Sequence, residues 1–188
     1  MYRYIELYSI YIGIMRTIDR LSIKYNWCNM IEIYKTTELK RIQLLAELTW
    51  YTTYSSILKS EQLHYMFDLM YSTSQLEANL LNGNQFHIIK EESTDLGFTE
   101  IILYPHYIKI NKIYIIPEQQ GKGLGNKMIN NIEQIAASLN VSKITLNVNR
   151  YNKALHFYIK SGFSIIEEVD VEIGNGYLME DYILEKII

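Results

Sequence analysis

Cysteine is almost absent from this sequence, because Cys28 is the single thiol among 188 residues. One cysteine excludes an internal disulfide and a cysteine-based zinc site, and it fits a reducing, cytoplasmic compartment. The four histidines, His64, His87, His106 and His156, show no metal-ligand spacing such as H-x-x-x-H. We therefore predict no metal site.

The sequence also lacks a long apolar run and an excess of positive charge. The apolar part of the N-terminal segment, Tyr4 to Met15, contains Glu6 and is shorter than the ~20 residues that span a membrane. It also lacks the small-residue cleavage site of a secretory signal. Lys and Arg total 18 against 21 Asp and Glu, without the basic cluster that nucleic-acid binding needs. We expect neither a membrane nor a nucleic acid as partner.

The length is sufficient for one domain with its own hydrophobic core. We predict a single domain over residues 30–188, preceded by an N-terminal extension over residues 1–29. Two interpretations of the extension stay open. It is either an amphipathic helix packed on the domain or the product of an upstream mis-start, with translation beginning at Met30.

Strand and helix patterns alternate from Met30 onward. Alternating β-branched residues predict strands, and apolar residues spaced three and four apart predict helices. The predicted strands are residues 31–35, 86–91, 96–104, 106–116, 143–149, 163–173 and 176–187. The predicted helices are residues 37–55, one helix or two short ones over 60–83, residues 124–139 and residues 150–162. Leading helices, a meander, one strand-helix-strand crossover and a closing strand pair predict a mixed sheet of the α/β (α+β) class.

Residues 117–126 read PEQQGKGLGN and place three glycines between a predicted strand and a predicted helix. The first amides of a helix are unpaired and the helix dipole favours negative charge there, so this stretch predicts an anion site. Gly121, Gly123 and Gly125 leave the backbone bare, and Lys122 adds a positive charge. The P-loop pattern and the dinucleotide pattern G-x-G-x-x-G are both absent. The spacing that holds is Q-x-x-G-x-G, which alone also fits a plain turn before a helix.

Residues 147–163, NVNRYNKALHFYIKSGF, carry a second signal. Asn149 stands at a predicted strand end, Asn152 lies in the first turn of the next helix, and Tyr158 follows six residues later. Together the two segments resemble the GNAT superfamily of N-acetyltransferases, over a region from about residue 31 to the C-terminus. LTWYTTYSSILKSEQLHYMFDLMYS and VEIGNGYLMEDYILEK are further similar to the bacterial branch that includes polyamine acetyltransferases.

The resemblance implies a GNAT-like fold, with a mixed, mostly antiparallel sheet of about six to seven strands flanked by about four helices. It also implies acetyl-CoA as the acetyl donor, lying between the strand before the glycines and the strand that ends at Asn149. Tyr158 matches the family position that protonates the leaving thiolate. The positions that match donor-binding residues of the family are Ile115, Gln120, Gly121, Lys122, Gly123, Leu124, Gly125, Asn126, Asn149 and Asn152.

The acceptor implied by the resemblance is a primary amine of a small molecule, with a polyamine as the first candidate. A protein N-terminus or lysine, an aminoglycoside, and a non-catalytic acyl-CoA-binding module remain alternatives. Trp50 and Tyr54 stand four residues apart on one helix face, so they are candidate substrate contacts, although they fit core aromatics equally well. A homodimer is left open by the sequence.

The general base stays unassigned by the sequence. An amine acceptor must lose a proton before it attacks, so a base or a water chain is expected. Glu100 is the first acidic candidate and Glu118 the second. Asp181 and Tyr182, in the last predicted strand, either line the opening of the active site or cap the sheet.

Overall fold

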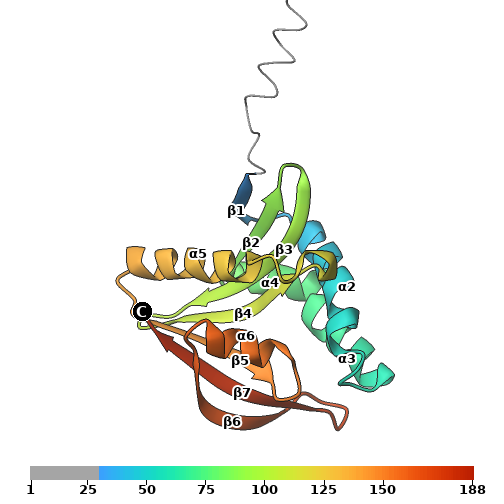
Figure 1. Ribbon diagram of the computed structural model, residues 1–188. Helices are drawn as coiled ribbons and strands as arrows, with labels where there is room; N and C mark the ends of the chain where they lie inside the picture. Colours follow the sequence, from blue (N-terminus) through green and yellow to red (C-terminus); the bar gives the residue numbers. More distant parts are fainter. Residues whose placement is uncertain (1–29) are drawn as a thin grey trace, which may run out of the picture. The chain divides into compact units, whose positions relative to one another are not determined.

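The computed structural model describes residues 30–188, which are drawn in colour in Figure 1. The extension predicted over residues 1–29 lies outside the described residues. The strands are β1 (Ile31–Thr36), β2 (Gln85–Glu91), β3 (Thr94–Leu103), β4 (Ile108–Ile115), β5 (Lys143–Asn149), β6 (Ser164–Glu172) and β7 (Leu178–Ile187). The helices are α2 (Leu39–Tyr54), α3 (Ser60–Tyr71), α4 (Thr73–Leu81), α5 (Leu124–Ser138) and α6 (Ala154–Lys160), with a 3-10 turn η1 (Pro117–Gln119) before α5.

The seven strands form one sheet in the order β1-β2-β3-β4-β5-β7-β6. Neighbouring strands are antiparallel except β4 and β5, which are parallel. The predicted mixed, mostly antiparallel sheet of the GNAT type is confirmed. The described residues contain five helices rather than about four, because the region 60–83 forms both α3 and α4. The two helices separate at Ser72, where an extended ψ of 148° interrupts the helical backbone.

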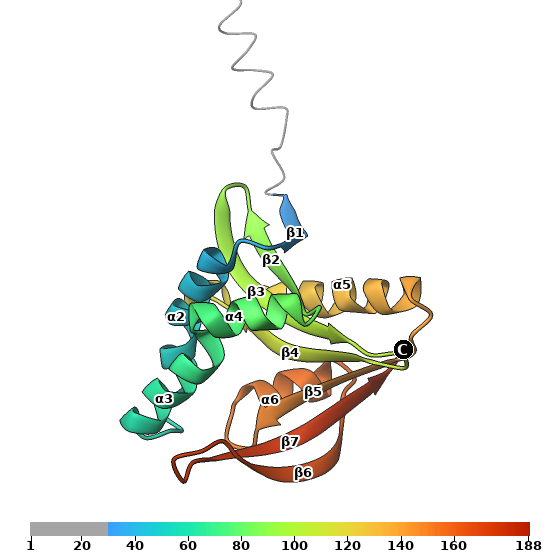
Figure 2. The same ribbon diagram turned by 180° about the vertical axis from the view of Figure 1, so that it is seen from behind.

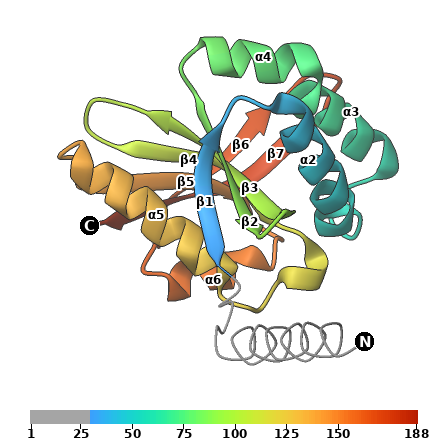
Figure 3. The same cartoon turned by 90° about the horizontal axis from the view of Figure 1, so that it is seen from above.

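Helices cover both faces of the sheet. As Figure 2 and Figure 3 show, α2, α3 and α4 lie on one face, and α5 and α6 lie on the other. Each helix turns an apolar stripe toward the sheet, as the helical repeat requires. On α5 this stripe includes Leu124, Met128 and Ile132, which are at most 5% exposed. Buried apolar side chains cluster under both helical layers, so the sheet is held rigidly from both sides.

A β-bulge in β4 separates this strand from β5. The pairing of β3 with β4 shifts register between Glu100 and Ile101, which leaves Asn111 as an extra residue on β4. An extra residue of this kind bends the strand and disrupts the ladder. β4 pairs with β5 only at residues 108–110, opposite residues 144–146. Beyond these residues β4 and β5 are not paired with each other, and we call the region between them the β4–β5 opening.

No helix within residues 30–188 is long and apolar enough to cross a membrane. In the same part of the chain, no three His, Cys, Asp or Glu side chains gather in an arrangement that could hold a metal ion. The cytoplasmic location remains a prediction, and the homodimer that the sequence left open stays open.

Candidate active site

The glycine loop, residues 120–126, leads from η1 into α5. Gly121 and Gly123 have φ angles of 77° and 78°, a region in which a residue with a side chain is strained. A Cβ atom added to either glycine would meet nothing within 4 Å, so both face open space. At Gly125, by contrast, a Cβ atom would lie 2.9 Å from Cζ of Phe157. Two of the glycines thus shape the loop, and the third lets α5 approach α6.

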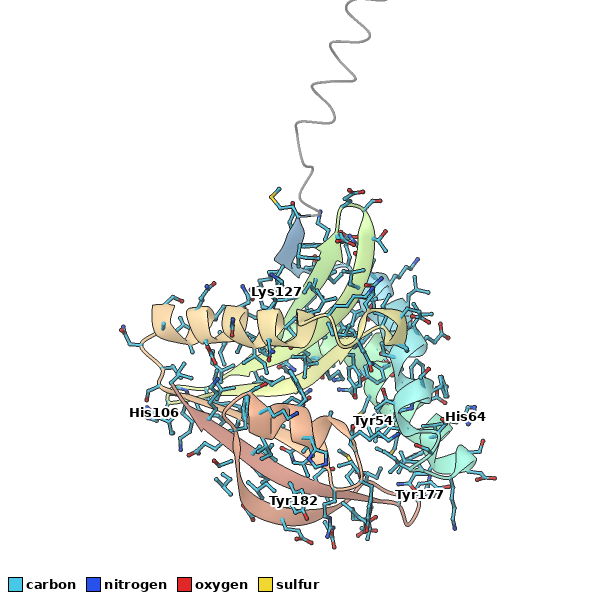
Figure 4. All side chains as sticks on the ribbon, viewed as in Figure 1. Tyr54, His64, His106, Lys127, Tyr177 and Tyr182 are labelled. Carbon is cyan, nitrogen blue, oxygen red and sulfur yellow. The ribbon has the colours of Figure 1, made fainter. Side chains whose placement is uncertain are left out.

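Free backbone donors gather where the glycine loop enters α5. Lys127, labelled in Figure 4, donates its amide to the carbonyl of Gly123 at 3.1 Å and begins the helical ladder. Within the described residues, the amides of residues 121–126 donate no backbone hydrogen bond. Lys122 is exposed beside them, with its Nζ donating to Oε1 of Gln119 at 2.7 Å. Free amides, the helix dipole and a lysine together favour an anion such as a pyrophosphate.

Two other residues of the glycine loop use their side chains for packing. Leu124 is 5% exposed and belongs to a buried apolar cluster. Asn126 accepts a hydrogen bond through Oδ1 from Oγ of Ser161 at 3.1 Å. These side chains attach the loop to the core and to the end of α6, so an anion at the loop would meet their backbone amides.

A hydrogen bond joins the glycine loop to the end of β4. Gln120 donates through Nε2 to the carbonyl of Ile115 at 3.0 Å. Ile115 pairs with Gly97 of β3 but has no partner on β5 among the described residues. An unpaired strand edge presents N–H and C=O groups that can pair with an extended ligand. The β4–β5 opening is therefore suited to a ligand that carries amides.

Two asparagines lie on the β5 side of the opening. Asn149 accepts a hydrogen bond through Oδ1 from the amide of Tyr151 at 3.0 Å. Asn152 accepts one through Oδ1 from the amide of Ala154 at 2.9 Å, which caps the start of α6. The Nδ2 atom of Asn152 also lies 3.5 Å from the hydroxyl of Tyr54 on α2. Asn152 therefore links the start of α6 to the helical layer on the other face.

Four tyrosines, which we call the tyrosine cluster, converge from different elements: Tyr54 of α2, Tyr71 of α3, Tyr114 of β4 and Tyr158 of α6. The hydroxyls of Tyr54, which Figure 4 labels, and Tyr114 are 3.4 Å apart. Burial raises the pKa of all four phenols. The neighbouring Tyr54 further raises the pKa of Tyr158. The hydroxyl of Tyr158 therefore stays protonated at neutral pH, which is the form that can donate a proton.

Glu100, the first acidic candidate for the base, is fully buried and firmly held. Its Oε1 accepts hydrogen bonds from Nδ2 of Asn79 at 2.9 Å and Nδ2 of Asn84 at 2.6 Å. Its Oε2 accepts one from Nδ2 of Asn111 at 3.0 Å and forms an ion pair with Lys112. These donors occupy both carboxylate oxygens, so Glu100 holds the β4 bulge and is not free to receive a proton from a substrate.

Asp181 of β7 is a second buried carboxylate, only 3% exposed. It lies directly across from Asn149, at the open end of β5. Burial raises the pKa of Asp181, whereas a hydrogen bond from Asn147 and the charges of Lys109 and Arg150 lower it. No salt bridge joins Asp181 to a cation within the described residues.

Trp50 and Tyr54 share one face of α2 but differ in their surroundings. Trp50 is 2% exposed, and its Nε1 donates to the carbonyl of Leu63 at 3.1 Å. Its ring also packs edge-on against Tyr71, with centroids 5.7 Å apart. Trp50 is therefore a core aromatic and offers no surface for a substrate. Tyr54 is only partly buried and directs its hydroxyl into the tyrosine cluster.

Sequence reasoning missed Tyr71 and Tyr114 and left Asp181 between two roles. These residues come from α3, β4 and β7, so no spacing along the chain connects them. The one available signal was the alternation in the last strand, which places Asp181 on the opposite face from the apolar Leu184. The residue that Asp181 opposes on the neighbouring strand depends on the register, which the sequence does not give.

Comparisons with known proteins agree with this architecture. The sequence model described as the acetyltransferase (GNAT) family matches residues 44–163. A spermidine N(1)-acetyltransferase of Thermoplasma acidophilum is 26% identical over 158 residues, which are 80% of this chain and 96% of that protein. The crystal structure of the PaiA N-acetyltransferase of T. acidophilum, in complex with coenzyme A, has a TM-score of 0.71 at 26% identity. That alignment covers 85% of this chain and 99% of the PaiA chain.

A chimera of the spermidine N-acetyltransferase SpeG from Vibrio cholerae with hSSAT has a TM-score of 0.58 at 22% identity, over 84% of this chain and 95% of its own. This likeness shows the fold alone. The match to the family model, in contrast, spans more than half of the chain and includes both the glycine loop and α6. The chain therefore belongs to the acetyltransferase (GNAT) family and is an N-acetyltransferase that takes its acetyl group from acetyl-CoA.

Proposed function

We propose that the protein transfers the acetyl group of acetyl-CoA directly to a primary amine of a small molecule, with a polyamine as the first candidate. The observation that carries this proposal is the β4–β5 opening, which has free loop amides at one end and Tyr158 packed in one buried cluster with Ile110 of β4 and Val148 of β5. The polyamine assignment is supported by the 26% identical spermidine N(1)-acetyltransferase, of which the alignment covers 96%.

The chain's own residues fit the donor. The amides of residues 121–126 and the charge of Lys122 would hold the pyrophosphate, because Gly121 and Gly123 leave open space around the backbone. The unpaired edge of β4 near Ile115 would pair with the amides of the pantetheine arm. Asn149 and Asn152 would complete the site from the β5 side.

Direct transfer requires no covalent nucleophile from the protein. A thioester is the group that the donor supplies, and an amine attacks its carbonyl carbon. A backbone amide of the unpaired β4 edge would stabilise the developing oxyanion. Tyr158 would protonate the leaving sulfur. At reference pKa values of about 10 for the phenol and 8.5 for the thiol this step is uphill by about 2 kcal/mol, and the burial that raises the pKa of Tyr158 adds to this cost. We therefore expect the proton to move as the carbon–sulfur bond breaks.

The first experiment measures acetyl-CoA binding by calorimetry and thiol release with spermidine and a panel of monoamines, aminoglycosides and peptide N-termini. We expect turnover with spermidine to exceed turnover with peptides. In Tyr158→Phe, kcat should fall by about 100-fold or more, the range of general acid catalysis, with unchanged acetyl-CoA affinity. Tyr151→Phe is the matched control, because Tyr151 is 64% exposed and only seven positions away, and it should leave kcat unchanged.

The alternatives predict different results. Turnover confined to peptides or aminoglycosides would contradict the polyamine assignment while leaving direct acetyl transfer intact. Tight acetyl-CoA binding without turnover on any amine would indicate an acyl-CoA-binding module. Full activity in Tyr158→Phe at every pH would show that another group protonates the thiolate.

A further inference from the structure

An acceptor amine needs a group that removes its proton. A primary amine with a pKa of about 10.4 is almost entirely ammonium at pH 7, and the ammonium form has no lone pair with which to attack. Glu100 and Asp181 are the buried carboxylates of residues 30–188. Glu100 is neutralised by Lys112, whereas no described cation forms a salt bridge with Asp181. Burying an unpaired carboxylate is costly unless a ligand supplies the missing cation.

Asp181 lies on the face of the sheet opposite to α6. Side chains alternate along a strand, so Tyr182, labelled in Figure 4, and Leu184 point to the other face, where they pack in one cluster with Tyr158. Asp181 shares its face with the directly opposed Asn149, at the end of β5 that has no partner on β4. The carboxylate is therefore on the side of the sheet that α2, α3 and α4 cover, and the phenol of Tyr158 comes from the other side.

The charges around Asp181 connect it to the tyrosine cluster. Burial raises the pKa of Tyr54, and the nearby Asp181 carboxylate raises it further. Tyr54 in turn raises the pKa of Tyr158, so the Tyr54 phenol is near both the carboxylate and the predicted acid. The other charges that act on Asp181 are Lys109 of β4 and Arg150 after β5. The guanidinium of Arg150 is already paired with acidic side chains of β6 and β7.

We propose that Asp181 binds the ammonium group of the acceptor and takes its proton before attack. This role rests on the acetyl transfer proposed above. The proton moves from nitrogen to a carboxylate oxygen, and the freed lone pair forms a carbon–nitrogen bond with the thioester carbonyl. The carbon–sulfur bond breaks with its electron pair going to sulfur, which takes the proton of Tyr158. The second proton lost by nitrogen restores the Tyr158 phenol, and the proton on Asp181 passes to solvent.

Burial assists the transfer because it raises the pKa of Asp181 and so narrows the difference from the pKa of the ammonium group. Each pKa unit of this difference amounts to about 1.4 kcal/mol in the equilibrium of the transfer.

Asp181→Asn tests the proposal, because the amide keeps the size of the side chain and removes the negative charge. With spermidine and saturating acetyl-CoA, kcat/KM for the amine at pH 7 should fall by about 100-fold or more. Acetyl-CoA affinity by calorimetry and the melting temperature should change little. Glu180→Gln is the matched control, since the neighbouring Glu180 has a 44% exposed side chain that faces Arg150 and carries the same charge. Its activity should match that of the unmodified protein.

The pH profile separates proton removal from a merely structural role. If the substrate binds as ammonium and the ionised Asp181 removes its proton, kcat/KM should stay constant between pH 7 and pH 9, because both groups keep their charge in this range. Asp181→Asn must use the small neutral fraction of the amine, so its kcat/KM should rise about tenfold per pH unit toward the pKa of the amine. The deficit of the variant should therefore shrink steadily as the pH increases.

Two results would overturn this role for Asp181 alone. One is spermidine turnover by Asp181→Asn within about twofold of the unmodified protein, and the other is a deficit that is constant from pH 7 to 10. Absence of turnover by the unmodified protein with every amine would instead remove the proposed function, and the role of Asp181 with it.

Discussion

Replacing Lys112 by methionine should destabilise the domain strongly, because the change leaves Glu100 buried without its cation. The two side chains are 6% and 0% exposed, so water cannot replace the lost charge. Removing one partner of such a buried pair costs about 3–5 kcal/mol. A domain of this size has a total unfolding free energy of about 5–15 kcal/mol, so the loss is a large fraction of its stability.

The double variant Glu100→Gln with Lys112→Met should recover part of this loss. It removes both charges, and the glutamine oxygen can still accept hydrogen bonds from two of the asparagines that now hold Glu100. Lys90→Met is the control, because Lys90 pairs with Glu32 at the surface and such pairs contribute about 0–1 kcal/mol. Urea unfolding of all three variants at pH 7 gives the free energies. If Lys112→Met loses no more than Lys90→Met, the bulge is not held by this ion pair and our assignment of Glu100 is wrong.

Two further outcomes are expected. Gly125→Ala should destabilise the protein by about 1–2 kcal/mol, since its Cβ would lie 2.9 Å from the Phe157 ring, and adding Phe157→Leu should remove most of this loss in thermal unfolding. Burial and the charge of Lys35 lower the pKa of His87 to about 4 from 6.5. As the pH falls, His87 is therefore protonated in the unfolded chain before it is protonated in the folded protein. Its contribution to the free energy of unfolding is complete above pH 6.5 and declines as the pH falls toward 4. His87→Gln should flatten this decline in urea unfolding at pH 7 and pH 5.

Much of the fold could be predicted because each element carries a local pattern. The alternation in residues 143–149 and the helical repeat that starts at Leu124 gave the elements almost to their observed bounds. The separation of α3 from α4 at Ser72 could not be predicted, since serine also occurs inside helices and the extended backbone there depends on packing.

The glycine loop illustrates how far the site itself could be predicted. The pattern identified Gly121, Gly123 and Gly125 together, with one reason for all three. In the structure the first two are needed for backbone conformation, and the third is needed because Phe157 lies against it. Residue 157 is more than thirty positions away, so that reason depends on how α5 and α6 pack.

The tyrosine cluster could not be predicted for a related reason. Tyr54 and Tyr114 are 60 positions apart, and their hydroxyls approach to 3.4 Å only because α2 packs on the face of β4. The β4 bulge at Asn111 could not be predicted either, because no residue type at that position indicates a bulge. Long-range packing decides these features, and a single sequence does not record it.

The proposed acid, Tyr158, and the proposed base, Asp181, come from opposite faces of the sheet, so we expect donor and acceptor to bind on different faces. The donor is expected at the glycine loop and α6, whereas Asp181 faces the layer formed by α2, α3 and α4. On that side, α3 is fastened to the β6–β7 hairpin: Tyr65 donates its hydroxyl to the carbonyl of Ile173 at 2.6 Å, and Gln62 donates through Nε2 to the carbonyl of Leu178 at 3.1 Å. Because Asp181 lies on the face that these helices cover, we expect the acceptor amine to contact α2, α3 or this hairpin. Under this proposal acceptor choice would depend on these elements and donor binding on the glycine loop, so the substrate of such an enzyme could change while its chemistry is retained.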